Sequence, residues 1–174
     1  YITYYISTSD DTHWAAAGIG YVFRDNLTRM PLYYLIIEIF GRFFGQGHGE
    51  GMILAGAVLN VLFSTAALIA LYYLAYGILN SRISAWFIAA ITLWSGLHVY
   101  HSTQALGDML LILLYILTAY ALISGKGGWA YVAAVAAFLS RQDGALLLLI
   151  VPAWLFLGHD RKRSLRLLMA SAFL

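Results

Sequence analysis

An apolar run from Met52 to Leu79 that contains no charged residue is the strongest constraint on the fold of this chain. A helix needs about 20 predominantly apolar residues to cross the hydrocarbon core of a bilayer, and this run is longer than that. Further apolar runs follow along the chain: Ile83–His101, Ala105–Ile123, Trp129–Ser140, Ala145–Leu157 and a last run that begins near Leu165. Together the runs predict an all-α fold, a polytopic transmembrane helical bundle.

Composition favours a membrane protein over the alternative, a soluble all-helical domain. Only 10% of the 174 residues are charged and 62% are apolar, which is too little charge to cover a soluble domain of this size. The chain has no cysteine, which excludes disulfides and cysteine-bound metals. Its net charge of +2 gives no reason to expect nucleic acid as a partner. Membrane lipid is the expected partner.

Residues 1–174 are predicted to form a single membrane domain. The two ends of the chain predict that this domain is a fragment of a longer protein. Residues 1–6, YITYYI, look like the end of a first span, and SLRLLMASAFL enters another span at the C-terminus. Residues 7–51 are then a large external loop, and residues 52–174 hold the transmembrane helices.

The external loop is expected to contain two interfacial helices. Residues 9–23 predict the first helix, and the segment PLYYLIIEIFGRFF predicts a second that begins at Pro31, a residue suited to the first helical position. Glu38 and Arg42 form an i,i+4 pair on one side of the second helix. Its other side has an apolar stripe suited to the membrane interface. The stripe consists of Leu32, Leu35, Ile36, Ile39, Phe40 and Phe43.

Basic residues in the short connections predict the orientation. Arg82, Lys126 and the Arg161–Arg163 segment fall on one face if the apolar runs are real spans, and that face is the cytoplasmic one by the positive-inside rule. All the acidic residues except Asp160 then lie on the opposite, external face or at its border with the membrane. They are Asp10, Asp11, Asp25, Glu38, Glu50, Asp108 and Asp143.

Two short runs place the SRQDG turn at an unusual depth. At 1.5 Å per residue, Trp129–Ser140 and Ala145–Leu157 reach only about 18 to 20 Å, whereas the hydrocarbon core is roughly 30 Å thick. The turn is therefore expected to lie below the external surface. Charged, non-helical backbone at that depth lies against protein or a water-filled cavity.

Asp10 and Asp11, in the stretch TSDDTHW, are the first candidate site residues. One of them is enough to cap a helix, which is the structural alternative. The other is a candidate general base or metal-binding carboxylate, because two adjacent carboxylates repel each other and protonation of one is then favoured.

Further candidates lie at the predicted external ends of later spans. Asp108 is either an acid in the first turn of a helix or a functional carboxylate close to the membrane. Arg141 either forms a local ion pair with Asp143 or faces a cavity and holds an anionic headgroup, for which a guanidinium is well shaped. Arg29 either binds an anion in the same way or extends its charged end to the membrane interface.

Histidines offer a weaker metal hypothesis. His98 and His101 share a helix face at i,i+3 spacing near Asp108, and His13 could complete a divalent-metal site with them. Asp10 is the other carboxylate candidate for such a site. The spacing alone favours interfacial histidines without a metal, so the cofactor is left open.

The order of these motifs resembles the GT-C membrane glycosyltransferases, in particular the aminoarabinose and protein O-mannosyl transferases. An acidic pair followed by an aromatic opens the external loop, here Asp10 to Trp14, and an Ala-rich segment, AAAGIG, comes next. Later come RMPLYYLIIEIFGRFFG, LGDMLLILLYIL and FLSRQDGALLLLIVP. The chain departs from the family pattern in having Asp11 where Glu is usual, Met30 in place of the first proline and Arg29 in place of Lys.

The resemblance implies roles for individual residues. Asp10 would be the catalytic base, with Asp11 beside it, and Asp108 a second carboxylate of the site. Arg29 and Arg141 would hold the phosphate of the donor. Accessory positions would be His13, Trp14, His101 and Asp143.

The function that the resemblance implies is transfer of a sugar from a polyprenyl-phosphate donor to an acceptor hydroxyl. The acceptor would be a protein, a glycan or a lipid on the external face of a bacterial or archaeal plasma membrane. The alternative is a non-catalytic GT-C-like subunit of a larger membrane complex, which would have membrane-complex partners. A transporter is disfavoured, because the longest runs lack the interruptions and polar residues typical of one.

Overall fold

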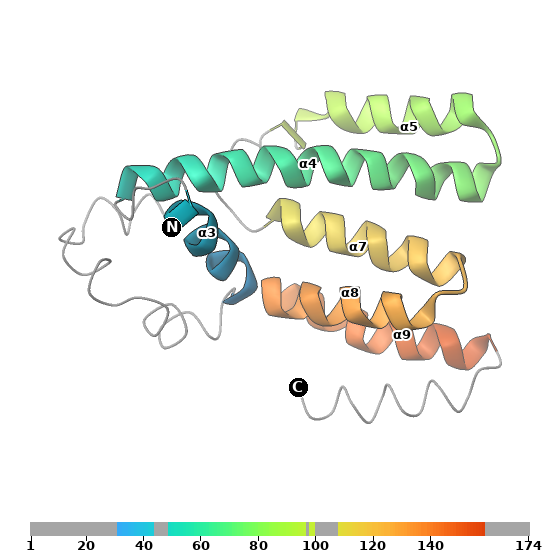
Figure 1. Ribbon diagram of the computed structural model, residues 1–174. Helices are drawn as coiled ribbons and strands as arrows, with labels where there is room; N and C mark the ends of the chain where they lie inside the picture. The colour runs from blue at the N-terminus through green and yellow to red at the C-terminus, as the bar shows by residue number, and fades with distance from the viewer. Residues whose placement is uncertain (1–30, 44–48, 97, 100–107, 159–174) are drawn as a thin grey trace.

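The computed structural model describes residues 31–43, 49–96, 98–99 and 108–158, and these residues form helices without any β-strand (Figure 1). The all-α prediction is therefore confirmed for this part of the chain. The elements are α3 (Pro31–Phe43), α4 (Gly49–Leu79), α5 (Arg82–Trp94), α7 (Asp108–Ile123), α8 (Gly127–Ser140), the 3-10 helix η1 (Gln142–Gly144) and α9 (Ala145–Leu157). Leu54–Leu79 is the one stretch among the described helices that is long and apolar enough to cross a membrane, and the other apolar helices are shorter.

Local chemistry explains where the helices begin and end. α4 ends at Leu79, and the next residue, Asn80, has a positive φ of 50°. Asparagine tolerates this conformation better than most residues. Ser81 caps α5, and its hydroxyl accepts a hydrogen bond from the Ser84 amide at 3.3 Å. Gly125, with φ of 70°, turns the chain between α7 and α8.

The helix predicted over Ile83–His101 is not continuous, because it is interrupted at Ser95, although Gly96, His98 and Val99 are helical again. α5 ends at Trp94, because Ser95 adopts an extended conformation and its hydroxyl donates to the Thr92 carbonyl at 2.9 Å. The same hydroxyl accepts the amide hydrogen of His98 at 3.2 Å. Serine side chains that bond to nearby backbone groups compete with a continuing helix in this way.

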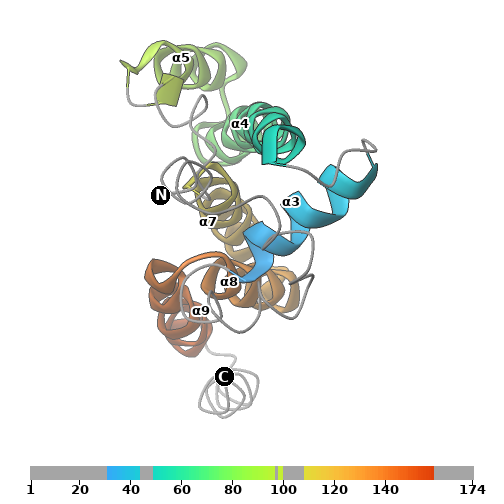
Figure 2. The same cartoon turned by 90° about the vertical axis from the view of Figure 1, so that its left-hand side faces the viewer.

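The helices form a layered bundle in which the chain direction alternates from each helix to the next, from α4 to α9 (Figure 1). α4 lies between α5 and α7, α8 packs against α7, and α9 packs against α8. α3 contacts both α4 and α8 and crosses one end of the bundle, as the end-on view in Figure 2 shows.

The two ends of the bundle differ in charge. The α4–α5 and α7–α8 turns, with Arg82 and Lys126, lie at one end, called here the Arg82 end. The start of α7, with Asp108, and the α8–α9 turn, with Arg141, lie at the other, the Asp108 end, where α3 also lies. This arrangement agrees with the predicted grouping for the turns that the structure describes, whereas Arg161–Arg163 lies outside the described residues.

Small residues form the contact surface of α8. Its buried residues are Gly127, Ala130, Ala134, Ala137 and Ser140. Such residues allow helix backbones to approach closely. A Cβ on Gly127 would lie 2.8 Å from a methyl carbon of Leu155 on α9. A larger residue at Gly127 would therefore require the Leu155 side chain to shift.

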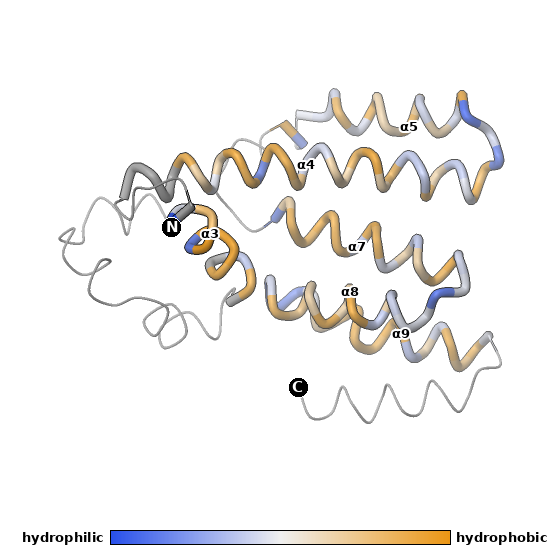
Figure 3. The backbone as a smooth tube through the Cα atoms, viewed as in Figure 1, coloured by the Kyte–Doolittle hydropathy of each residue, from blue (hydrophilic) through white to orange (hydrophobic). Residues whose placement is uncertain are grey.

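Large apolar side chains lie on the surface of the bundle as well as in its core. Every described α-helix exposes at least one, and Figure 3 shows apolar residues along the whole length of the bundle. Ile83 and Trp94 on α5 are 84% and 88% exposed. A surface with this much exposed apolar area is unusual for a soluble monomer.

α3 packs into the bundle through Tyr33 and Ile37, and three residues of the predicted stripe pack beside them: Leu32, Ile36 and Phe40. The Tyr33 hydroxyl donates a hydrogen bond to Asn60 Oδ1 of α4 at 3.1 Å. The i,i+4 pair is confirmed, since Arg42 Nη2 lies 2.5 Å from Glu38 Oε1. The placement of the stripe at the membrane interface stays a prediction.

Candidate functional site

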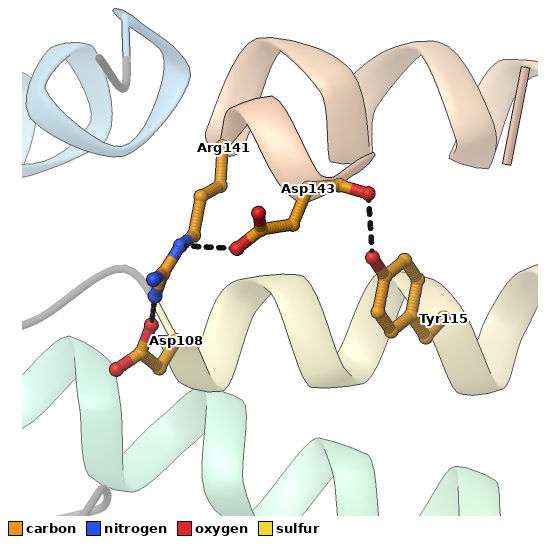
Figure 4. Close-up of polar contacts among 4 residues, drawn as sticks. All are labelled: Asp108, Tyr115, Arg141 and Asp143. Atoms are coloured by element: carbon orange, nitrogen blue, oxygen red, sulfur yellow. Dashed lines mark hydrogen bonds and ion pairs between the residues drawn. The ribbon is translucent and has the colours of Figure 1, made fainter. Parts of the chain in front are cut away.

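An ion pair between Asp108 and Arg141 is the main feature of the Asp108 end (Figure 4). Asp108 is the first residue of α7, and Arg141 directly follows α8. Arg141 Nη1 donates to Asp108 Oδ1. The Asp108 side chain is 14% exposed and that of Arg141 is 38% exposed, so the pair is partly shielded from solvent. Two residues that the sequence singled out separately are therefore in direct contact.

Asp143 supplies a second carboxylate to the same guanidinium. Its Oδ2 lies 2.8 Å from Arg141 Nε, and its side chain is 61% exposed. The local Arg141–Asp143 pair that the sequence left open is thus present, together with the longer-range pair to Asp108. The three side chains carry one positive and two negative formal charges, so the cluster is net negative.

The main chain of the α8–α9 turn fixes the position of Arg141. The Arg141 amide donates to the Ala137 carbonyl at 2.9 Å, and the Arg141 carbonyl accepts from the Gly144 amide at 2.9 Å. A Cβ on Gly144 would lie 2.2 Å from the Ala137 carbonyl carbon, a distance that no side chain can occupy. Glycine is therefore needed here for the turn to pack against α8.

Tyr115 holds the same turn from α7, a role that the sequence did not suggest. Its hydroxyl donates to the main-chain carbonyl of Asp143 at 2.8 Å (Figure 4). The signal that could have found Tyr115 is its position seven residues after Asp108, which places both on one face of α7.

The site is recessed relative to the start of α4. Leu110 and Leu59 belong to one buried cluster with Tyr33 and Ile37 of α3. At 1.5 Å per residue, Leu59 lies about 15 Å along α4 from its start. α3 crosses this end of the bundle and contacts α4 and α8 (Figure 2). The predicted depth of the SRQDG turn in a bilayer stays a prediction, because it needs the position of the membrane.

A second polar contact lies between α4 and the segment after α5. Ser64 Oγ is 2.7 Å from His98 Nε2, and both residues are buried. Asn60 lies one turn before Ser64 on α4 and is fully buried. A buried polar group must find a hydrogen-bonding partner, and these residues find theirs within the bundle.

The metal hypothesis gains no support from the part of the chain that the structure covers. Among these residues, no group of three His, Asp or Glu side chains could hold an ion. His98 Nε2 is engaged by Ser64, and Asp108 by Arg141. The metal hypothesis stays a prediction, because Asp10, His13 and His101 lie outside the described residues.

Several predicted site residues lie outside the described residues. They are Asp10, Asp11, His13, Trp14, Arg29 and His101. The structure thus places Asp108, Arg141 and Asp143 together, and the roles assigned to the others stay predictions.

Comparison of the chain with protein-family models, with curated proteins and with solved structures finds no match.

Proposed function

We propose that the chain is part of a polytopic integral-membrane protein whose Asp108 end faces the outside of the cell. Three features support this: the length and composition of Leu54–Leu79, the exposed apolar residues on every described α-helix, and Arg82 and Lys126 at the opposite end. Cytoplasmic connections are rich in Lys and Arg.

Aromatic residues near the Arg82 end support a position of this end at a membrane–water interface. Trp129 lies in the first turn of α8 and is 71% exposed, and Trp154 lies near the end of α9 and is 53% exposed. Trp86 is 66% exposed, and its ring packs against Tyr72 with 5.2 Å between centroids. Trp and Tyr are enriched where a helix passes from lipid to water.

We propose further that this protein is a glycosyltransferase that uses a polyprenyl-phosphate-linked sugar and an acceptor hydroxyl. The observation that carries the proposal is the contact between Asp108 and Arg141. A second carboxylate of the proposed site and a guanidinium that can bind a phosphate lie side by side at the end where a lipid headgroup would lie.

In this mechanism, a carboxylate takes the proton of the acceptor hydroxyl, and we assign that role to Asp10. The acceptor oxygen forms a bond to the anomeric carbon while the bond from that carbon to the phosphate oxygen breaks. The electron pair leaves with the phosphate, and Arg141 stabilises the charge that develops there. Positioning and charge stabilisation of this kind supply most of the rate in such reactions.

The test is transfer in reconstituted membranes. The protein in proteoliposomes is supplied with a panel of polyprenyl-phosphate sugars, and release of polyprenyl phosphate is measured. Arg141→Gln should reduce turnover by at least a hundredfold. Arg82→Gln, at the opposite end, is the matched control and should retain activity. Equal activity of the wild type and Arg141→Gln would refute the assignment.

The alternative function is a non-catalytic subunit of a larger membrane complex. The observation that favours it is the bare outer face of α5. This helix packs mainly against α4 and exposes Ile83, Phe87 and Trp94. Such a face could receive helices of a partner. This function predicts a defined hetero-oligomer in mild detergent and no transfer with any donor.

A further inference from the structure

The guanidinium of Arg141 is already engaged by carboxylates of its own chain. Nη1 donates to Asp108 and Nε lies 2.8 Å from Asp143 Oδ2. The cluster therefore has a net charge of −1, which disfavours the approach of another anion. The two carboxylates use Nη1 and Nε of the five N–H donors of Arg141. A phosphate would bind more tightly if one carboxylate gave up its hydrogen bond, because a further donor would then be open to it and the local charge would be less negative.

Asp108 is the carboxylate better placed to move away. Asp143 is two residues from Arg141 in the same turn, and Tyr115 fixes its main chain. Asp108 comes from a different helix, and it lies at the N-terminus of α7. Because a helix N-terminus favours a negative charge, Asp108 keeps one favourable interaction when it releases Arg141.

We infer that Asp108 and a phosphate ligand compete for the same edge of Arg141. Asp108 occupies the place of the phosphate in the ligand-free protein, and phosphate binding releases its carboxylate. The ligand class is a phosphate monoester or diester anion, either on a lipid or free in solution. The inference rests on the proposed function for the use of the site, because a released carboxylate can then accept a hydrogen bond from an acceptor hydroxyl.

Competition predicts that removing the carboxylate of Asp108 strengthens phosphate binding. The protein in nanodiscs of neutral phosphatidylcholine is titrated with three probes: inorganic phosphate, phosphatidate and a polyprenyl monophosphate. Asp108→Asn should bind the phosphate probe about tenfold more tightly than the wild type, because the competing charge is gone. Asp143→Asn, the matched control, should gain about twofold or less, because its exposed carboxylate is screened. Arg141→Gln should lose binding.

Each outcome decides the inference. Unchanged or weaker binding by folded Asp108→Asn would overturn it, and so would the absence of binding by every variant. Tighter binding of all three probes points to the phosphate group itself, whereas tighter binding of the lipid probes alone points to a headgroup. Tighter binding without any sugar transfer would keep the inference and reject the glycosyltransferase. Sugar transfer without tighter phosphate binding by Asp108→Asn would keep the glycosyltransferase proposal and reject the inference.

A second measurement covers the case in which Asp108→Asn does not fold. Isotope-edited infrared difference spectra of protein labelled at the aspartate carboxylates can be recorded before and after addition of inorganic phosphate. One carboxylate band should shift in the wild type and in Asp143→Asn. No shift in either protein at a phosphate concentration that saturates binding would contradict the release of Asp108.

Discussion

Tyr115 of α7 donates a hydrogen bond to the main-chain carbonyl of Asp143, and so ties the turn that carries Arg141 to the helix that begins with Asp108. The two partners of the ion pair are therefore positioned by one shared helix. Disturbing this hydrogen bond should affect how Arg141 meets an anion without removing any charge from the site.

Tyr115→Phe should weaken the hold on the turn. One neutral hydrogen bond contributes about 0.5 to 1.5 kcal/mol, so the melting temperature should fall by a few degrees. Arg141-dependent phosphate binding should also weaken. Thermal unfolding in detergent and titration with inorganic phosphate check the two effects. Tyr120→Phe on the same helix is the control and should match the wild type in both.

Gly144→Ala should destabilise the fold strongly. The added Cβ would lie 2.2 Å from the main chain of Ala137, so the turn would have to move away from α8. Overpacking of this kind costs about 1 to 3 kcal/mol or more. Gly77→Ala is the control, because nothing lies within 4 Å of a Cβ there, and it should be neutral or slightly stabilising. Equal unfolding temperatures for the two variants would contradict the close approach.

The attachment of α3 to α4 depends partly on the Tyr33–Asn60 hydrogen bond at 3.1 Å. A double-mutant cycle with Tyr33→Phe and Asn60→Leu should give a coupling energy of about 0.5 to 1.5 kcal/mol. Chemical unfolding of the four proteins provides the measurement. A coupling energy near zero would mean that apolar packing alone holds α3 in place.

The orientation can be tested with single cysteines, because the chain has none of its own. Ser124→Cys lies in the α7–α8 turn, and Gln142→Cys lies in the α8–α9 turn. A membrane-impermeant maleimide added to intact cells should label Gln142→Cys, whereas Ser124→Cys should react only after permeabilisation. Labelling of both positions from the outside would reject the proposed orientation.

Apolar runs predicted where helices form more reliably than where a helix ends or which residues of other helices it contacts. The run Met52–Leu79 became most of α4, and Ala145–Leu157 matches α9, because long apolar runs leave few alternatives. The end of α5 at Trp94 was missed, because it depends on how the Ser95 side chain bonds to the backbone. The contact of Tyr33 on α3 with Asn60 was not predicted, because Asn60 lies on another helix.

The sequence likewise predicted some features of the candidate site and missed others. Counting the turns placed Asp108 and Arg141 at one end, since an antiparallel bundle brings alternate turns together. Their direct contact could not be predicted, because it depends on the extended conformation of Arg141 and the close packing of Gly144. Tyr115 is engaged through a main-chain carbonyl of Asp143, and sequence patterns carry little information about main-chain partners.

The small buried residues of α8 also determine which substitutions this helix can tolerate. On the inner face, at Ala130, Ala134 and Ala137, added volume should be harmful whatever its polarity, because helix backbones already lie close there. On the outer face, at Val132 and Leu139, size should matter little and an added charge should be harmful. A saturation mutagenesis profile of α8 should therefore separate into one side limited by volume and another limited by polarity.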